Sequence, residues 1–444
     1  MKITQFYTDE YSASANYQSF RSIGSYIDGL KNGARKIVYT IDKNNITSDI
    51  KVSQLGSKVA ELTEYLHGET SLYSTIVGLA QTFPGSNNLN LLQPEGNFGT
   101  RFIQEASAGR YIYTKKSKYF DQVFMREDRD ILISQDFEGK TIEPKFYIPI
   151  IPMILVNGSE GIGNGFAQKI LPRDEKKIIE MILSYLKQNK KITSITPHMK
   201  GFHGKIEITN DNGDTKVLMS GKIDVVNSNT LRISEIPTIY DLQSYIKVLN
   251  KLEEDKIIKG YSDKSENDVY QFDIDVTREF AKTSQEELLK IFKLTKSFTE
   301  NFTCIDENNA IVEFKNEKEL LMSYIKVRLD YYSKRKKYIL SDLLEQNTIL
   351  ENKIKFIEKI NSGELVVSNK SKNEIEKQLV KLRIKKINND YEYLLRLSIY
   401  SLTKEKIQEL KEALSQNKKK IEELQLKNEK DLWTEDLEEL KKHL

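Results

Sequence analysis

The chain has a single cysteine, Cys304, and few histidines. One cysteine cannot form an internal disulfide, and the histidines are too scattered for the usual zinc spacings. We therefore expect no metal site in this chain and a reducing compartment, hence the cytoplasm. The four histidines are His67, His198, His203 and His443.

Long apolar runs and an export signal are also missing. No stretch of the 444 residues approaches the roughly 20 apolar residues that cross a bilayer. The N-terminus, MKITQFYTDEYS, contains no apolar signal region. Hydrophobic residues make up 39% and charged residues 30% of the chain, with a mean hydropathy of −0.52. We expect no membrane partner and a multidomain protein.

A strong charge of one sign is absent as well. The 68 basic and 65 acidic residues leave a net charge of +3, which says little about partners. A phosphate-binding protein can gather its cations on one face, so local runs matter more. These runs are KNGARK (31–36) and KKSK (115–118). Either run is equally compatible with a solvated surface, the commoner fate of such runs.

Helical periodicity dominates residues 28–83. The stretch SLYSTIVGLAQTF repeats apolar residues at helical spacing, and PGSNN after it ends the helix. A shorter helix, QLGSKVAELTEYL, precedes it, with a break at His67-Gly68. A helix-turn-helix can place one helix in the major groove of DNA, but helix pairs of this kind more often pack only in the hydrophobic core. The apolar face comprises Leu72, Ile76, Leu79, Ala80 and Phe83.

The middle of the chain changes character twice. The prolines in YIPIIPMILV (147–156) predict an extended or edge segment, not a central strand. The glycines of NGSEGIGNGF do not have dinucleotide-loop spacing, and they leave Ile162 without local packing partners. Residues 200–237 predict short strands, GKIEIT and TLRISEI, with NDNGD as a hairpin signal. Residues 241–314 mix helices and strands.

Two long helices are predicted in the last third. Both carry apolar residues at heptad spacing, and a compact helical piece lies between them around residues 379–402. This order predicts an antiparallel hairpin with a knob at its tip, either in an ordinary long-helix protein or as an arm that pairs with its twin. The apolar positions are Ile325, Leu329, Tyr332, Ile339, Leu343, Leu350 and Ile357, then Ile407, Leu410, Leu414, Ile421 and Leu424.

Chemistry is concentrated in EASAGRYIYT (105–114), where Arg110 and Tyr111 follow four small residues. A tyrosine phenol has a pKa near about 10 and becomes a useful nucleophile when cations stabilise the phenolate. Small neighbours would let a charged polymer approach. The alternatives are packing in a tight turn and a half-buried structural tyrosine, the usual fate of the 23 tyrosines. For Tyr113 we favour a structural role.

In this order, the segments resemble the breakage-reunion part of type IIA DNA topoisomerases, from about Phe20 to the C-terminus. The motifs that carry the likeness are DGLKNGARK, YLHGETSLYSTIVGLAQTFPGSNNLNLLQPEGNFGTR, EASAGRYIYT, YIPIIPMILVNGSEGIGNGF, VRLDYYSKRKKYIL and DLWTEDLEEL. The resemblance implies an α+β multidomain fold. Its parts would be a winged-helix DNA cleavage domain (1–165), an α/β tower (166–318) and an antiparallel coiled-coil arm (319–444) with a helical dimerisation insert around 364–403.

The resemblance also implies a function, the cleavage and religation of DNA by an ATP-dependent type IIA topoisomerase. Tyr111 would form a transient 5′-phosphotyrosyl link in each strand, with Arg110 on the scissile phosphate. His67 and Arg35 would support the same phosphate. Many members of the family have two consecutive histidines where this chain has Leu66-His67. The loop from Arg101 to Ala106 is shorter than in cellular enzymes.

Further DNA contacts are implied outside the reacting atoms. Ile162 would act as a wedge that unstacks a base step and kinks the duplex, at a cost of about a few kcal/mol. Its alternative is a small buried isoleucine in a glycine turn. Lys31, Lys36 and Lys51 would contact the DNA backbone, although a plain surface lysine is nearly as common at position 51.

The segments that do not occur suggest the partners. No EGDSA-like motif with a later Asp-x-Asp and no ATPase-like segment occurs, and the chain ends at Leu444 before a DNA-wrapping domain. We expect a homodimer on double-stranded DNA, similar to the separate breakage-reunion subunit of T-even-type bacteriophage members of the family. Mg²⁺ and ATP would be bound by an ATPase/Toprim large subunit, and the activity would be relaxation and decatenation. The alternative is a non-catalytic DNA-binding or coiled-coil structural protein that retains the fold.

Overall fold

The computed structural model describes residues 3, 6–211, 214–387 and 389–444. It divides into a first unit, Met1–Arg328 with Thr434–Leu444, and a second unit, Leu329–Trp433. The predicted arm covers residues 319–444, whereas the second unit begins at Leu329 and ends at Trp433. The last residues of the chain, Thr434–Leu444, belong to the first unit. Within the described residues, no helix has both the length and the apolar character needed to span a membrane.

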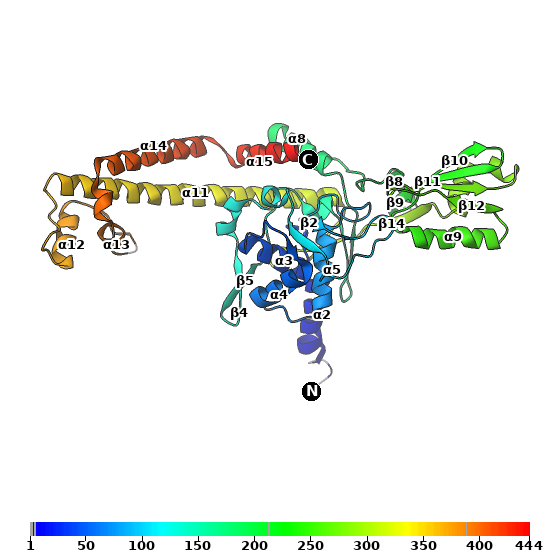
Figure 1. The fold of residues 1–444 in the computed structure, drawn as a ribbon, viewed down its shortest axis with the longest axis horizontal. Coiled ribbons are helices and arrows are strands. Elements are labelled where there is room, and N and C mark those ends of the chain that lie inside the picture. Colours follow the sequence, from blue (N-terminus) through cyan, green and yellow to red (C-terminus); the bar gives the residue numbers. More distant parts are fainter. Residues whose placement is uncertain (1–2, 4–5, 212–213, 388) are drawn as a thin grey trace. The chain divides into compact units, whose positions relative to one another are not determined.

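The N-terminal part of the first unit packs helices around a small antiparallel sheet of order β1-β3-β2 (Figure 1). Helix α5 buries Leu72, Ile76 and Ala80, which confirms the predicted apolar face. It ends at Ala80, before Phe83, because Gln81 adopts an extended conformation. The elements are η1 (Phe6–Tyr11), α2 (Ser12–Ser22), α3 (Asn32–Lys43), β1 (Ile50–Lys51), α4 (Val52–Thr63), α5 (Glu69–Ala80), β2 (Leu92–Glu95) and β3 (Tyr113–Lys116).

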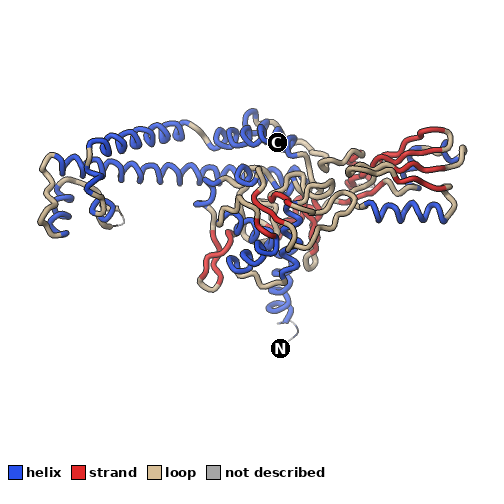
Figure 2. The backbone as a smooth tube through the Cα atoms, in the orientation of Figure 1, coloured by secondary structure: helices blue, strands red, loops and turns tan. Residues whose placement is uncertain are grey.

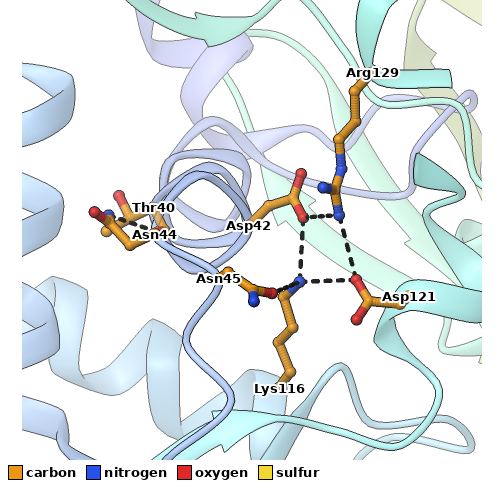
Figure 3. A network of polar contacts seen from close by, with 7 residues as sticks. All are labelled: Thr40, Asp42, Asn44, Asn45, Lys116, Asp121 and Arg129. Atoms are coloured by element: carbon orange, nitrogen blue, oxygen red, sulfur yellow. Dashed lines mark hydrogen bonds and ion pairs between the residues drawn. The ribbon is translucent and has the colours of Figure 1, made fainter. Parts of the chain in front are cut away.

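Strand β3 is anchored at its C-terminal end by a network of charged side chains (Figure 3). The Lys116 ammonium donates to Asp121 at 2.7 Å, Asn45 at 3.2 Å and Asp42 at 3.4 Å. Arg129 donates to the same Asp42 oxygen at 2.6 Å. Burial raises the pKa of Asp42, and the positive charges of Arg129 and Lys116 act in the opposite direction. Part of the basic run at 115–118 is therefore internal.

The segment 147–156 is buried and forms no strand. It has no regular structure up to Pro152, with bends at Ile150 and Ile151, after which Met153–Val156 make the single turn of helix α7. The absence of a strand among these described residues agrees with the prediction, but the helical turn that follows Pro152 was not predicted. The neighbouring elements are α6 (Phe120–Val123), η2 (Arg126–Ile131), β4 (Ser134–Phe137), β5 (Lys140–Pro144), β6 (Ser159–Ile162), β7 (Ala167–Ile170) and α8 (Glu175–Gln188).

Residues 205–314 form three antiparallel sheets, of orders β14-β9-β8, β10-β11-β13-β12 and β15-β16. The four-stranded sheet packs with α9 and α10 around a common apolar core. The predicted strands GKIEIT and TLRISEI are confirmed as β8 and β11. The centre of the predicted NDNGD hairpin, residues 212–213, lies outside the described residues, but Asp211 and Asp214 pair across it.

The elements of these sheets alternate with short helices. They are β8 (Lys205–Asp211), β9 (Asp214–Ser220), β10 (Lys222–Asn227), β11 (Thr230–Glu235), α9 (Leu242–Glu254), β12 (Gly260–Asp263), β13 (Phe272–Asp275), η3 (Phe280–Lys282), α10 (Gln285–Ile291), β14 (Thr295–Thr299), β15 (Phe302–Ile305) and β16 (Ile311–Phe314).

In the residues that the structure describes, the second unit consists of helices joined by loops (Figure 2). Most of α11 (Glu317–Asn361) runs antiparallel to α14 (Lys404–Leu426), because Glu351 pairs with Lys418 whereas the later Glu358 pairs with the earlier Lys411. Both predicted long helices are thereby confirmed. Between them, α12 (Lys372–Lys381), α13 (Glu392–Leu395) and η4 (Ile399–Leu402) enclose a small apolar core, and α15 (Glu429–His443) follows α14.

Candidate DNA cleavage site

Tyr111 lies in an exposed turn directly before β3, which we call the tyrosine turn (residues 108–111). Its side chain is 69% exposed, so it is not a half-buried structural tyrosine. The guanidinium carbon of Arg110 lies 5.6 Å from the centroid of the Tyr111 ring. The backbone N–H of Tyr111 donates to the Ala108 carbonyl at 2.9 Å and closes the turn. A guanidinium and a phenol are thus presented together to solvent.

The tyrosine turn is seated on the N-terminus of α4. The backbone N–H of Ser53 donates to the Gly109 carbonyl at 3.0 Å, and that of Val52 donates to the Ile112 carbonyl at 3.1 Å. A Cβ atom at Gly109 would lie only 3.2 Å from Val52. Gly109 is therefore small for packing, whereas Ala108 is exposed and leaves room for a ligand. Both explanations for the small residues apply, at different positions.

Lys51 lies beside this turn, because it pairs with Tyr113 across β1 and β3. Its ammonium lies 6.0 Å from the centroid of the Tyr113 ring. The Lys51 position is compatible with the predicted contact to a DNA phosphate next to Tyr111. Tyr113 is a strand residue that packs beside this lysine, in keeping with a structural role.

A second part of the site is a cavity of about 630 Å³ in the first unit, which we call the His67 cavity. The Nε2 atom of His67 lies 2.8 Å from the Tyr17 hydroxyl. Burial lowers the pKa of His67 below its ordinary 6.5, and the nearby charges of Arg21 and Lys36 lower it further. The lowered pKa favours the uncharged imidazole, which can donate one hydrogen bond and accept another.

Besides Lys36, which is paired with Glu143, two further cations line the His67 cavity. Lys31 lines the cavity and its ammonium donates to the Glu160 carbonyl at 2.6 Å. Burial lowers the pKa of Lys31, and the negative charge of Glu160 opposes this effect. Arg21 also lines the cavity, with its guanidinium carbon 5.7 Å from the centroid of the Tyr17 ring. Arg21 and Tyr17 were not predicted as site residues, because they lie far from His67 in sequence.

Arg35 and Lys36 are placed differently from the prediction. Arg35 is 3% exposed, and its guanidinium donates to the Asp28 carboxylate at 2.7 and 3.2 Å. Lys36 is 9% exposed, and its ammonium donates to Glu143 at 2.9 Å and to the Thr63 carbonyl at 2.7 Å. Buried charges need such partners, and here the partners come from within the chain. The predictions that Arg35 supports the scissile phosphate and that Lys36 binds the DNA backbone therefore do not fit the structure.

Ile162 stands at the end of β6 in a two-stranded hairpin with β7, which we call the Ile162 hairpin (residues 159–170). Its side chain is 81% exposed, so the alternative of a small buried isoleucine is wrong. Because Lys31 bonds to Glu160 in this hairpin, the hairpin borders the His67 cavity. An exposed aliphatic side chain at the border of a cavity has the form expected of a wedge.

The tyrosine turn and the His67 cavity are distinct in a single chain. Neither Arg110 nor Tyr111 is among the described residues that line the cavity, whereas Lys31, Lys36 and His67 are. Within the residues that the structure describes, no three His, Cys, Asp or Glu side chains form a group that could hold a metal ion.

The known proteins to which this chain is similar all belong to one family. Residues 21–438 match the family model for the A subunit of DNA gyrase/topoisomerase IV. The chain is 38% identical over 447 residues to mitochondrial DNA topoisomerase 2 of Dictyostelium discoideum, covering 98% of this chain and 34% of that protein. It is 35% identical over 468 residues to DNA topoisomerase 2 of Plasmodium falciparum, covering 96% of this chain and 33% of that protein.

A solved structure agrees with these relatives. The crystal structure of the Plasmodium falciparum topoisomerase II DNA-binding, cleavage and re-ligation domain superposes with a TM-score of 0.90 at 35% identity, covering 98% of this chain and 64% of that one. The chain belongs to the type IIA topoisomerase family that includes the A subunit of DNA gyrase/topoisomerase IV. It spans about one third of the length of the curated relatives above.

Proposed function

We propose that this chain cleaves and religates double-stranded DNA through Tyr111. The Tyr111 phenol gives up its proton to solvent water and its oxygen attacks a backbone phosphorus, so that a P–O bond to tyrosine forms and the P–O3′ bond breaks. The DNA 3′ oxygen takes up a proton and leaves as a hydroxyl, while the 5′ end stays on the protein. Religation is the reverse step, so the phosphotyrosyl bond conserves the energy needed for resealing.

The observation that carries this proposal is the joint exposure of Arg110 and Tyr111 on a turn that is firmly seated on α4. An Arg beside the nucleophile stabilises the negative charge that develops on the phosphoryl oxygens. His67, as a neutral imidazole, would donate a hydrogen bond to the same phosphate, and Lys31 and Arg21 would add positive charge. Because the cavity and the turn are distinct in one chain, we propose that they act on DNA within a homodimer.

We also propose the finer architecture that the family implies. Helices α3, α4 and α5 with the β1-β3-β2 sheet would be the winged-helix core, and residues 166–318 the tower. The hairpin of α11 and α14 would be a coiled-coil arm whose helical insert contacts its twin.

For partners, we propose a complex similar to that of the medium subunit of T-even-type bacteriophage DNA topoisomerase. A separate ATPase/Toprim large subunit would bind both ATP and Mg²⁺. The complex would relax and decatenate DNA in the cytoplasm of a bacterial host. Co-purification of this chain with such a subunit, followed by assays of topoisomers, tests this part.

The decisive experiment replaces the nucleophile. Tyr111→Phe should abolish the covalent DNA–protein adduct that survives denaturation, because no other oxygen occupies that position. The fold should be intact, since the removed hydroxyl belongs to an exposed side chain. Tyr113→Phe, two residues away on β3, is the matched control and should retain the adduct. An adduct formed by Tyr111→Phe would refute the proposal, and a wild type that binds DNA without any adduct would favour a non-catalytic DNA-binding protein.

A further inference from the structure

Helix α2 contacts two parts of the site with opposite faces. Tyr17 and Arg21 are one helical turn apart, line the His67 cavity, and bring the Tyr17 hydroxyl to His67. Ser19 lies two residues from Tyr17, so it points about 200° away around the helix. That second face meets the Ile162 hairpin.

The contact with the Ile162 hairpin is very close. The backbone N–H of Asn164 donates to the buried Ser19 hydroxyl at 3.2 Å. A Cβ atom at Gly163 would lie 2.8 Å from the Ser19 hydroxyl oxygen and 3.1 Å from its Cα. A Cβ atom at Gly161 would lie 1.9 Å from the Ser22 carbonyl oxygen. The two glycines that flank the exposed isoleucine are thus required by the backbone of α2.

The base of the same hairpin is fixed to the residues that follow α2. The Gln168 side chain accepts from the Gly24 N–H at 2.9 Å and donates to the Gly24 carbonyl at 3.1 Å. It also donates to the Thr303 carbonyl at 2.7 Å and accepts from the Ser159 hydroxyl at 2.6 Å. With Gln168 only 1% exposed, this junction is internal. The hairpin therefore has little freedom to move without moving the end of α2.

We propose that the second half of α2 is a rigid spacer that couples DNA bending at Ile162 to the arrangement of His67. Ser19 and Tyr17 are its positioning residues: Ser19 receives the displacement of the hairpin, and Tyr17 transmits it to the imidazole. On the hairpin side, close-packed contacts transmit small displacements because they leave no free volume to absorb them. On the cavity side, the hydrogen bond between the Tyr17 hydroxyl and His67 carries the displacement. The inference rests on the proposed function, since it assumes that Ile162 meets a DNA duplex.

The coupling can be tested without measuring catalysis. Because the chain has four histidines, their ring signals can be followed by NMR on protein with isotope-labelled histidine. Gly163→Ala and the smaller change Ser19→Ala both alter the contact between the Ile162 hairpin and α2, away from His67. Both should nevertheless shift the His67 signal. The signals of His198, His203 and His443 should stay in place. Gly260→Ala is the matched control, because a Cβ atom there meets nothing closer than 3.5 Å.

Bending is measured on the same variants with a duplex labelled at both ends with fluorescent dyes. Gly163→Ala should lower the energy transfer between the dyes and shift the His67 signal together. An unchanged His67 signal in both hairpin-side variants that retain the wild-type fold would overturn the inference, whether or not bending falls. A wild type that binds DNA without bending it would instead argue against the wedge in the proposed function.

The cavity side is tested with Tyr17→Phe in the complete enzyme. Loss of the hydroxyl should lower the cleavage rate by up to about 100-fold, because displacing a catalytic group such as His67 by about 1 Å can have an effect of that size. It should also alter the pH profile of cleavage, which a purely structural role would leave unchanged. Tyr261→Phe removes a comparable surface hydroxyl bound to Asn250 and is the control. Unchanged cleavage and pH profile in Tyr17→Phe would contradict the positioning role.

Discussion

The two ends of strand β3 differ sharply in exposure and in charge balance. Before the strand, Arg110 and Tyr111 are exposed. At the other end, Lys116 is 8% exposed and bonds to the carboxylates of Asp42 and Asp121 (Figure 3). A short strand can present a reactive side chain in a fixed position when its far end is held by several partners. The exposed side chains therefore lie at one end of β3, and the contacts that hold the strand in place lie at the other end.

The anchored end also explains why local basic runs are a poor guide to phosphate binding. Lys115 pairs with Asp49 and Glu95, and Lys116 with Asp42 and Asp121. Their positive charges are compensated within the chain. Arg110 is different because its guanidinium lies beside the aromatic ring of Tyr111, the proposed nucleophile, at 5.6 Å.

The largest expected effect belongs to the exposed end. Arg110→Ala should lower DNA cleavage by about 100-fold or more, because a preorganised donor to the developing phosphoryl charge is lost. The midpoint of thermal unfolding should not change, since the side chain is exposed. Arg110→Lys, which keeps the charge but not the planar fork, should recover part of the rate. Cleavage is measured as adduct formed per unit time; a large drop in unfolding temperature would show that Arg110 is structural.

The anchored end should respond in the opposite way. Lys116→Met should lower the free energy of unfolding by about 3 kcal/mol, because Asp42 loses one of its cations and remains buried. Chemical denaturation measures this loss. Lys115→Met, at the more exposed neighbouring position, is the control and should have little effect. Equal unfolding free energies for the two variants would mean that the buried network does not anchor β3.

A smaller effect concerns pH. Burial raises the pKa of Asp42 above its ordinary 3.8, so the folded protein holds this proton more tightly than the unfolded chain does. The contribution of Asp42 to stability is therefore greatest below about pH 3.8 and is lost as pH rises through the folded pKa. Asp42→Asn should remove this fall in the free energy of unfolding with rising pH. The fall in the wild type is less than about 1.4 kcal/mol per pH unit. Unfolding free energies measured from about pH 4 upward check the sign; a wild type that gains stability relative to Asp42→Asn over that range would contradict it.

The sequence was sufficient to predict features that depend on a single helix or a short motif. The periodicity of residues 72–80 and the heptads of α11 and α14 depend only on local spacing, and these helices are confirmed. The exposed positions of Tyr111 and Ile162 followed from motifs that lie within a few residues of each.

The sequence was insufficient where partners are distant. The motif that contains Lys36 does not reveal that Glu143 neutralises this lysine. For Arg35 the partner is close in sequence, since Asp28 lies 7 residues earlier in the same motif, but the spacing does not show that the two side chains are buried together. Glu143 lies 107 residues from Lys36, and Tyr17 lies 50 residues from His67. Such pairs depend on tertiary packing, which spacing along the chain does not encode.

The internal pairing of Arg35 and Lys36 also limits how strongly salt should weaken DNA binding. Each phosphate neutralised by a protein cation releases counterions and steepens the salt dependence by about 0.9 in the slope of log K against log salt. Ammonium and guanidinium groups already neutralised by Asp28 and Glu143 release none. Of the three basic residues in KNGARK, only Lys31 can contribute, so this motif adds about one unit to the slope where its composition suggests nearly three.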